Sequence, residues 1–317
     1  MRNENRRKIG EHVKDKMAKS KLKTKEKIVS LFMVSPLFIG FVVFTVIPLI
    51  VAIIYSFVDY MPLSGKIFPV SFNVYKRLFS GELVAVSFGQ VIANTLILMI
   101  SIPINLVTGL LFSIIITQKS FKGGSFFRVV LYLPAVTGAV AITLVWKLMF
   151  NQTQGIVNVI LKSTGLISEN IDWLGITSGS FYPRFVLIIK NVWGGIGGVV
   201  ILYVAGILNI PQTYYEAAEI DGATRMKKAL AITIPILTPI TFYHLIVSVI
   251  GGLQAFMDSQ LLSTTYATQT IVYFIYDHGI NNYLYGYASA ASVLLAIVIM
   301  IITFIQFKIS DKWVYSE

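Results

Sequence analysis

The chain has 317 residues, of which 56% are apolar and 13% charged, whereas soluble domains average about 45–50% and about 25%, so a soluble fold is disfavoured. The formal charge of +11 is concentrated at one end, since residues 1–27 alone carry a net +7. The distribution therefore excludes a basic nucleic-acid-binding face, and the absence of cysteine excludes disulfides, thiolate chemistry and cysteine-ligated metals.

The chain begins with a basic tail, residues 1–27, which holds 11 lysines and arginines. Residues 28–58 follow without a single charge, a run far longer than the 7–15 apolar residues of a cleavable signal peptide. We interpret this run as the first membrane span. The tail is explained by orientation and by attraction to anionic lipid, which contributes about 1 kcal/mol per cation near a charged surface.

A membrane-spanning helix needs about 20 apolar residues. Six stretches meet this requirement: 29–57, 87–117, 126–150, 185–208, 236–257 and 287–307. The predicted fold class is an all-α polytopic membrane protein with six transmembrane helices. Its predicted parts are the cytoplasmic tail 1–27, the membrane domain 28–308 and a short cytoplasmic tail 309–317. Bends are expected at four prolines, namely Pro36, Pro48, Pro103 and Pro134.

Lysines and arginines in the loops predict the orientation, because they are enriched on the cytoplasmic side. With the basic tail inside, the inner side holds 19 of these residues and the outer loops five. The inner set beyond the tail comprises Lys119, Lys122, Arg128, Arg225, Lys227, Lys228, Lys308 and Lys312. Both termini are therefore expected in the cytoplasm.

The inner loop between the fourth and fifth spans, residues 210–235, has well-defined local signals. Thr213 and Glu216 have the spacing of a capping box, which would start a helix at Thr213. Gly222 is suited to the left-handed conformation that ends such a helix. Thr224 can cap a second, basic helix. On these signals alone, a helix-turn-helix lying on anionic lipid is as good an interpretation as a protein-docking element.

The motif within this loop favours docking. Glu216-Ala217-Ala218, then Gly222 after three residues, then Ile232-Thr233-Ile234-Pro235 after nine, resembles the EAA loop of permease subunits of binding-protein-dependent ABC importers. Ile234 stands where leucine is usual, a conservative departure. Further similarity to the carbohydrate-uptake branch, the maltose-type permeases, runs over residues 31–310 and includes Asn94-Thr95, Leu133-Pro134, Trp146, Asn191 and Gly286-Tyr287-Ala288-Ser289-Ala290.

This resemblance implies a type I ABC importer permease fold and a role as half of the pathway for a sugar, most readily an oligosaccharide. It implies a second permease subunit, favouring a heterodimer, two ATPase subunits and an extracytoplasmic solute-binding protein, all at a bacterial cytoplasmic membrane. The chain has no G-x-x-x-x-G-K-[ST] phosphate loop. We therefore expect no enzymatic activity and no cofactor in this chain, with ATP and magnesium held by the partner ATPase.

The resemblance also assigns candidate site residues. Glu216 is expected to pair with a basic group on the ATPase, and Ala217 and Ala218 to allow close approach; the full coupling set is Glu216, Ala217, Ala218, Asp221, Gly222 and Ala223. The positions that match the substrate path are Asn191, Gly194, Gly195, Gly198, Ser248, Gly251, Gly252 and Ala255.

Two interpretations of this substrate set remain open. The small residues are equally consistent with close helix packing and with a cavity widened for a bulky saccharide. In the second case Asn191 and Gln254 would bond hydroxyl groups, while Trp193 or Phe256 would offer a ring face.

The sequence fits other functions less well. An ion-coupled secondary transporter would place ionisable residues in its spans, and only His244 lies well inside one. A permease for glycerol phosphate or a polyol stays within the same family, but the matched positions hold no arginine or lysine that could clamp a phosphate. No H-E-x-x-H pair or carboxylate cluster indicates a membrane enzyme or a metal site.

Overall fold

The computed structural model describes residues 27, 29–58, 60–61, 66–67, 72–81, 86–118, 121, 123–175, 179–262 and 265–315. The predicted basic tail, apart from Lys27, lies outside these residues, as do Lys119 and Lys122. The backbone forms two compact units, Met1–Ile54 and Tyr55–Glu317, which are described separately.

The first unit carries most of one apolar helical segment. Residues 29–41 are helical without a break at Pro36, and a π-helical turn, η1 (Val42–Val46), precedes α2 (Ile47–Phe57). Pro48 lies just after this turn. Because proline lacks an N–H and its ring crowds the carbonyl four residues back, the wider turn is an expected accommodation.

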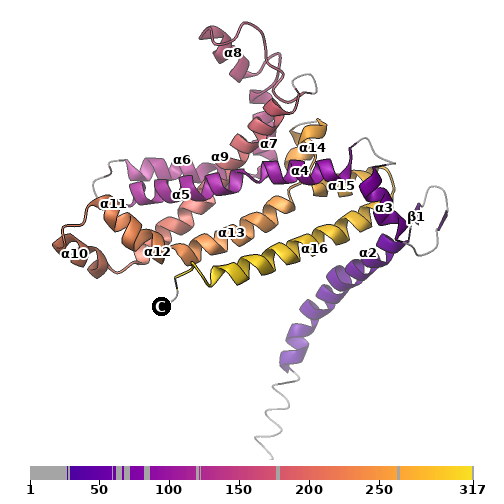
Figure 1. The fold of residues 1–317 in the computed structure, drawn as a ribbon, viewed down its shortest axis with the longest axis horizontal. Coiled ribbons are helices and arrows are strands. Elements are labelled where there is room, and N and C mark those ends of the chain that lie inside the picture. The colour runs from indigo at the N-terminus through magenta and orange to yellow at the C-terminus, as the bar shows by residue number, and fades with distance from the viewer. Residues whose placement is uncertain are drawn as a thin grey trace, which may run out of the picture. The chain divides into compact units, whose positions relative to one another are not determined.

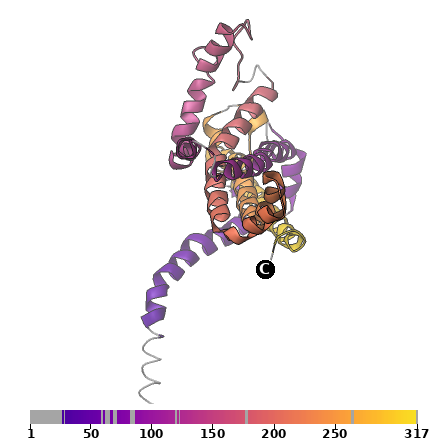
Figure 2. The ribbon, with the colours of Figure 1, turned by 90° about the vertical axis from the view of Figure 1, so that its left-hand side faces the viewer.

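The second unit is built almost entirely of helices (Figures 1 and 2). A two-residue hairpin, β1 (Tyr60–Met61) and β2 (Lys66–Ile67), pairs antiparallel with Tyr60 opposite Ile67. The helices are α3 (Asn73–Ser80), α4 (Phe88–Leu98), α5 (Ser101–Ile116), α6 (Gly124–Val136), α7 (Ala139–Met149), α8 (Ile156–Ser163), α9 (Phe181–Asn209), α10 (Gln212–Ile220), α11 (Arg225–Lys228), η3 (Ala229–Thr233), α12 (Ile234–Ile236), α13 (Thr238–Leu253), α14 (Met257–Leu261), η4 (Tyr266–Thr268), α15 (Ile271–Tyr276), η5 (Asp277–Asn281) and α16 (Tyr285–Ser310).

Five helical segments among the described residues are long and apolar enough to span a membrane, and they coincide with five of the six predicted spans: Val29–Phe57, Phe88–Ile116, Phe181–Asn209, Thr238–Leu261 and Tyr285–Ser310. The remaining stretch, 126–150, was predicted as a span with a bend at Pro134. In the structure it forms two helices, α6 and α7, which meet at a 102° bend. Thr137 leaves the helix for an extended conformation three residues after Pro134, which already removes one helical hydrogen bond.

Helix α9 is the centre of the second unit, packing on α5 and α6 along its length. Glycines allow these helices to approach one another closely. A Cβ added at Gly109 would collide with Val199, and one added at Gly197 would collide with the carbonyl of Leu131. Small residues at such crossings are typical of helices packed in membranes.

Prolines also coincide with the interruptions of α4–α5 and of the segment before α13. The chain leaves regular helix at Met99–Ile100, and Pro103 sits in the first turn of α5. The π-helical turn η3 ends two residues before Pro235. The expectation of bends at prolines is thus matched by helix interruptions near Pro48, Pro103 and Pro134, while Pro36 lies in unbroken helix.

A network of polar side chains joins the start of α9 to the loop before α15. Arg184 donates hydrogen bonds to Asn94 Oδ1 (2.7 Å) and to the carbonyl of Ala267 (3.0 Å). The amide of the fully buried Asn94 donates to the carbonyls of Tyr266 and Gln269. Because a buried backbone carbonyl needs a donor, this network fixes an irregular loop against α4 and α9.

Candidate functional site: the coupling loop and the helix faces of the path

The loop with the EAA motif forms two helices around a glycine turn, at one end of the second unit (Figure 1). Gly222 has φ +72°, and the Ala223 N–H bonds the Ala218 carbonyl at 2.9 Å. The predicted left-handed turn is confirmed. Thr224 is confirmed as the cap of α11, since its hydroxyl accepts the Lys227 N–H at 3.3 Å.

The predicted capping box at Thr213 is wrong. Helix α10 begins at Gln212, with Pro211 as its N-cap and no side-chain cap. Proline fixes φ near the helical value and has no N–H to satisfy, so the N-cap, Pro211, lies two residues before the expected Thr213. Thr213 therefore lies inside the first turn.

Most of the predicted coupling residues are exposed on this loop. Glu216, Ala217, Asp221 and Gly222 are exposed, while Ala218 and Ala223 are half-buried. Ile220 is 88% exposed, the most exposed large apolar residue among those described. Behind α10, a hollow of about 480 Å³ separates the helix from the ends of α5 and α9, and Glu216 lies on its rim with Glu219, Arg225 and Lys228.

The matched substrate positions lie on one face of α9, on one face of α13 and, for Ala255, just after the end of α13, and they differ in their surroundings. A Cβ added at Gly194, Gly198 or Gly251 would meet nothing within 4 Å. One added at Gly195 would collide with the Asn105 amide, and one at Gly252 would lie 2.9 Å from Met99. The α4–α5 segment thus packs against Gly195 and Gly252, and the other three glycines stay open.

The remaining matched positions are partly accessible. Asn191, Ser248 and Ala255 are half-buried. The Asn191 carbonyl accepts a hydrogen bond from Asn105 (3.1 Å), and within the described part of the chain the Asn191 side chain has no hydrogen-bond partner. An amide of this kind remains able to bond a solute.

A buried ion pair lies beside this path. Lys190, next to Asn191 in α9, binds Asp258 in α14, and the two side chains are only 11% and 15% exposed. Thr143 of α7 donates to the same carboxylate at 3.4 Å. The sequence does not indicate this pair, because nothing in its spacing shows that residues 68 positions apart are partners.

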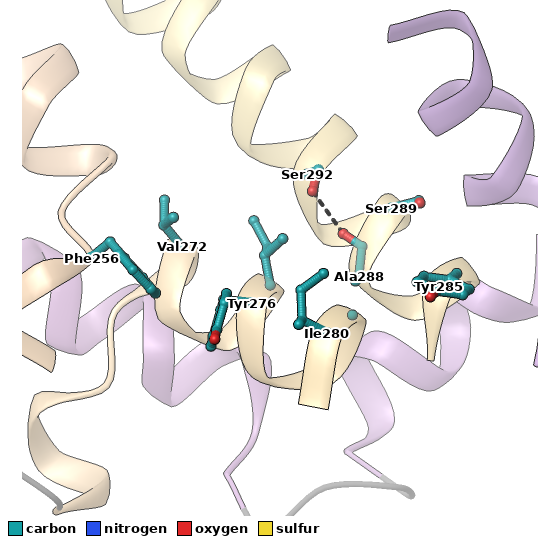
Figure 3. Close-up of a pocket in the computed structure, with 10 residues that line it drawn as sticks. Phe256, Val272, Tyr276, Ile280, Tyr285, Ala288, Ser289 and Ser292 are labelled. Carbon is teal, nitrogen blue, oxygen red and sulfur yellow. Dashed lines mark hydrogen bonds between the residues drawn. The ribbon is translucent and has the colours of Figure 1, made fainter. Parts of the chain in front are cut away.

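An aromatic groove of about 390 Å³ begins at Phe256, the residue after Ala255. Figure 3 shows Phe256 and Tyr276 facing the same space, with Tyr285, Ser289 and Ser292 on its other side. The rings of Phe256 and Tyr276 are 5.0 Å apart. Rings with nearby hydroxyl groups can bind the mixed apolar and polar faces of a sugar.

The comparisons with known proteins agree with this geometry. The chain is 30% identical over 314 residues to the probable ABC transporter permease protein YesP of Bacillus subtilis (strain 168), covering 96% of this chain and 97% of that protein. It is also 30% identical over 286 residues to the arabinooligosaccharides transport system permease protein AraP of the same organism, covering 88% and 87%. No family model matches the chain.

Solved structures show the same fold. A chain of a bacterial ABC transporter involved in the import of the acidic polysaccharide alginate matches with a TM-score of 0.79 at 26% identity, covering 91% of this chain and 96% of that one. A chain of a bacterial alginate ABC transporter in complex with an alginate pentasaccharide-bound periplasmic protein matches with a TM-score of 0.77 at 25% identity, covering 90% and 95%.

These observations define a multi-pass helical membrane protein with the fold of an ABC importer permease. The chain belongs to the ABC transporter permease proteins, in the branch of the carbohydrate-uptake permeases. The alternative of an ion-coupled secondary transporter is therefore not retained.

Proposed function

We propose that this chain is the permease subunit through which a neutral oligosaccharide crosses the cytoplasmic membrane. The observation that carries the proposal is the full-length similarity to permeases of saccharide importers, including one named for arabinooligosaccharides. The local chemistry supports a neutral cargo, since the open positions on α9 and α13 are glycines and the other matched positions hold no charged residue.

The proposed assembly contains a second permease, two ATPase subunits and an extracytoplasmic binding protein. A similar solved transporter is in complex with a periplasmic protein that holds a pentasaccharide. Both termini are proposed to be cytoplasmic. In support, the described basic residues Arg225, Lys227 and Lys228 belong to the loop that holds the EAA motif, and Tyr315 near the C-terminus bonds Thr238 at the start of α13.

The exposed residues of α10 and its turn are proposed to bind the ATPase. Glu216 would pair with a basic group there, while Ala217, Ala218, Asp221 and Ala223 form the surrounding contact around the Gly222 turn. ATP and magnesium would be bound by the ATPase alone. The exposure of Glu216, Ala217 and Ile220 supports this role, because a large apolar side chain exposed beside a charge is typical of a protein contact.

A first experiment tests the assembly. The chain is tagged, solubilised gently and purified with its bound proteins, alongside a variant altered at Glu216 and Gly222. We expect a second permease and an ATPase with the wild type, and no ATPase with the variant. A wild-type chain that purifies alone, with no ATPase, would contradict the proposal.

A second experiment tests cargo and path in proteoliposomes that contain the complex and its binding protein. We expect ATP-dependent uptake of an oligosaccharide and none of glycerol 3-phosphate. Gly194→Leu should block uptake while the complex still assembles and hydrolyses ATP, because the added side chain enters open space. Gly89→Leu is the matched control, since Gly89 also has open space but lies on α4; equal uptake by the two variants would refute a path along α9.

A further inference from the structure

The inner face of α10 is bonded to the segment that returns from the Gly222 turn to α13. Tyr215 and Glu219 lie one helical turn apart and so share a face. The Tyr215 hydroxyl is 3.0 Å from the hydroxyl of Thr233, and the Lys228 ammonium donates to Glu219 Oε1 at 2.6 Å. Helix α10 is therefore held at two points by its own return segment.

The Thr233 end of this contact is fixed in the body of the protein. Thr233 is 5% exposed and closes the π-helical turn η3. Its carbonyl accepts the N–H of Leu237, which is 1% exposed. Leu237 packs against Val199 and Tyr203 of α9.

The same contacts reach the helices of the proposed sugar path. The Tyr203 hydroxyl donates to Thr241 of α13 at 2.9 Å, and a Cβ at Gly206 of α9 would collide with Ile240. Thus α9 and α13, which carry all the matched substrate positions except Ala255, contact each other close to Thr233 in the chain. A displacement of α10 that is passed to Thr233 would move this junction.

We propose that Tyr215 and Thr233 are a positioning pair that transmits the movement of α10 to α9 and α13. The inference rests on the proposed coupling role and adds to it the residues by which this chain carries the motion inward. A contact of two side chains is suited to this task when both are held by packing, because packed elements shift as units.

The ion pair of Glu219 and Lys228 contributes less to transmitting the movement of α10. The Glu219 side chain is 65% exposed, and exposed ion pairs contribute little because water and salt screen them. Tyr215 is half-buried and Thr233 buried, so their hydrogen bond is shielded. The rigid phenol ring also loses less freedom on ordering than a long charged side chain does.

The test removes single hydroxyl groups and measures coupling. Tyr215→Phe, Thr233→Val and the double variant are purified within the complete complex, and sugar imported per ATP hydrolysed is measured in proteoliposomes. Tyr214→Phe is the matched control, because Tyr214 is the neighbouring tyrosine of α10, is 48% exposed, and its hydroxyl bonds none of the described residues.

We expect each single variant to retain the ATPase and its hydrolysis rate, while sugar imported per ATP falls about three- to tenfold, the range that corresponds to the loss of one shielded hydrogen bond. The double variant should be no worse than either single one, as expected for one shared interaction. Tyr214→Phe should match the wild type.

Two results would overturn the inference. Sugar imported per ATP could stay at the wild-type value in Tyr215→Phe, or the ATPase could be lost from that complex, which would make the hydroxyl part of the docking surface. Failure of the proposed function is distinct, since the wild-type complex would then contain no ATPase or show no ATP-driven uptake.

Discussion

Substitutions at Gly222 test the backbone conformation of the turn apart from the side chains around it. Its φ of +72° is strained for a residue with a Cβ, so Gly222→Val should distort the turn and lower sugar imported per ATP without unfolding the helices. Gly222→Asn should retain most of the activity, because asparagine tolerates this conformation. The measurement is uptake and ATP hydrolysis in the reconstituted complex.

The control for backbone strain alone is Gly165→Val. Gly165 has the same φ of +72° and open space around it, but it lies in the turn after α8. Normal uptake in Gly222→Val, or equal losses in both valine variants, would contradict a specific role of the Gly222 turn.

Local signals predicted this loop well where a single residue decides the conformation. Gly222 and Thr224 were placed correctly because a left-handed turn and a side-chain cap depend on the chain within four residues. Thr213 was misplaced because Pro211 offered a competing helix start. The partners Tyr215 and Thr233 were not predictable, since their contact depends on how α10 folds back.

At the scale of the helices, the pair of Lys190 and Asp258 gives a direct prediction. Replacing one partner leaves a buried charge alone, so Lys190→Met or Asp258→Asn should destabilise the α9–α14 contact by about 3 kcal/mol. The double variant Lys190→Met/Asp258→Met should recover most of that loss. Thermal unfolding of the solubilised chain measures these changes in stability. Lys147→Met of α7 is the control, because Lys147 is exposed.

Two results would contradict a structural role for the Lys190–Asp258 ion pair. If both single variants unfold at the wild-type temperature, the two charges do not hold α9 and α14 together. If the double variant is no more stable than the single ones, their contribution is not a shared interaction.

The helical segment before α16 is expected to respond to acid. Burial lowers the pKa of His278, partly offset by its hydrogen bond to the Phe274 carbonyl and by the Asp277 carboxylate. The imidazole ring also contacts Phe274, with ring centres 4.1 Å apart and the planes tilted by 34°. Because the unfolded segment binds the proton more readily, stability should fall as the pH drops below about 6.5.

Hydrogen exchange of the amides in η5 at pH 7.5 and pH 5.5 checks this expectation. Faster exchange at the lower pH, beyond the intrinsic change, is the expected result for the wild type. His278→Gln should remove the difference between the two conditions. The same difference in both proteins would assign the effect to another group, such as Asp277.

Hydropathy located the spans to within a few residues because length and apolar content are properties of the chain itself. Pro134 indicated a bend in 126–150, but the angle of 102° between α6 and α7 did not follow from the sequence. The break depends on contacts of α7 with α14 and of α6 with α9, which lie far along the sequence. Similarly, the open and packed glycines of α9 and α13 differ only in their neighbours.

At the scale of the whole molecule, the absence of cysteine makes the orientation directly testable. Ile220→Cys and Leu166→Cys each introduce one thiol at an exposed position, 88% and 73% exposed respectively. In intact cells a membrane-impermeant maleimide should label only Leu166→Cys, because the inner loops carry the positive charge. Labelling of Ile220→Cys before lysis would show that the topology is the reverse of the predicted one. Labelling of both variants after lysis is the control.

The bend between α6 and α7 has a consequence for how the protein is made. At about 1.5 Å per residue, the 13 residues of α6 and the 11 of α7 are each too short to cross a hydrocarbon layer of about 30 Å. Crossing the layer would therefore require both helices together. Since Thr143 of α7 bonds Asp258 of α14, this contact can form only after a helix more than a hundred residues later in the chain has been synthesised. We therefore expect the position of α7 to be fixed late in the biogenesis of this permease.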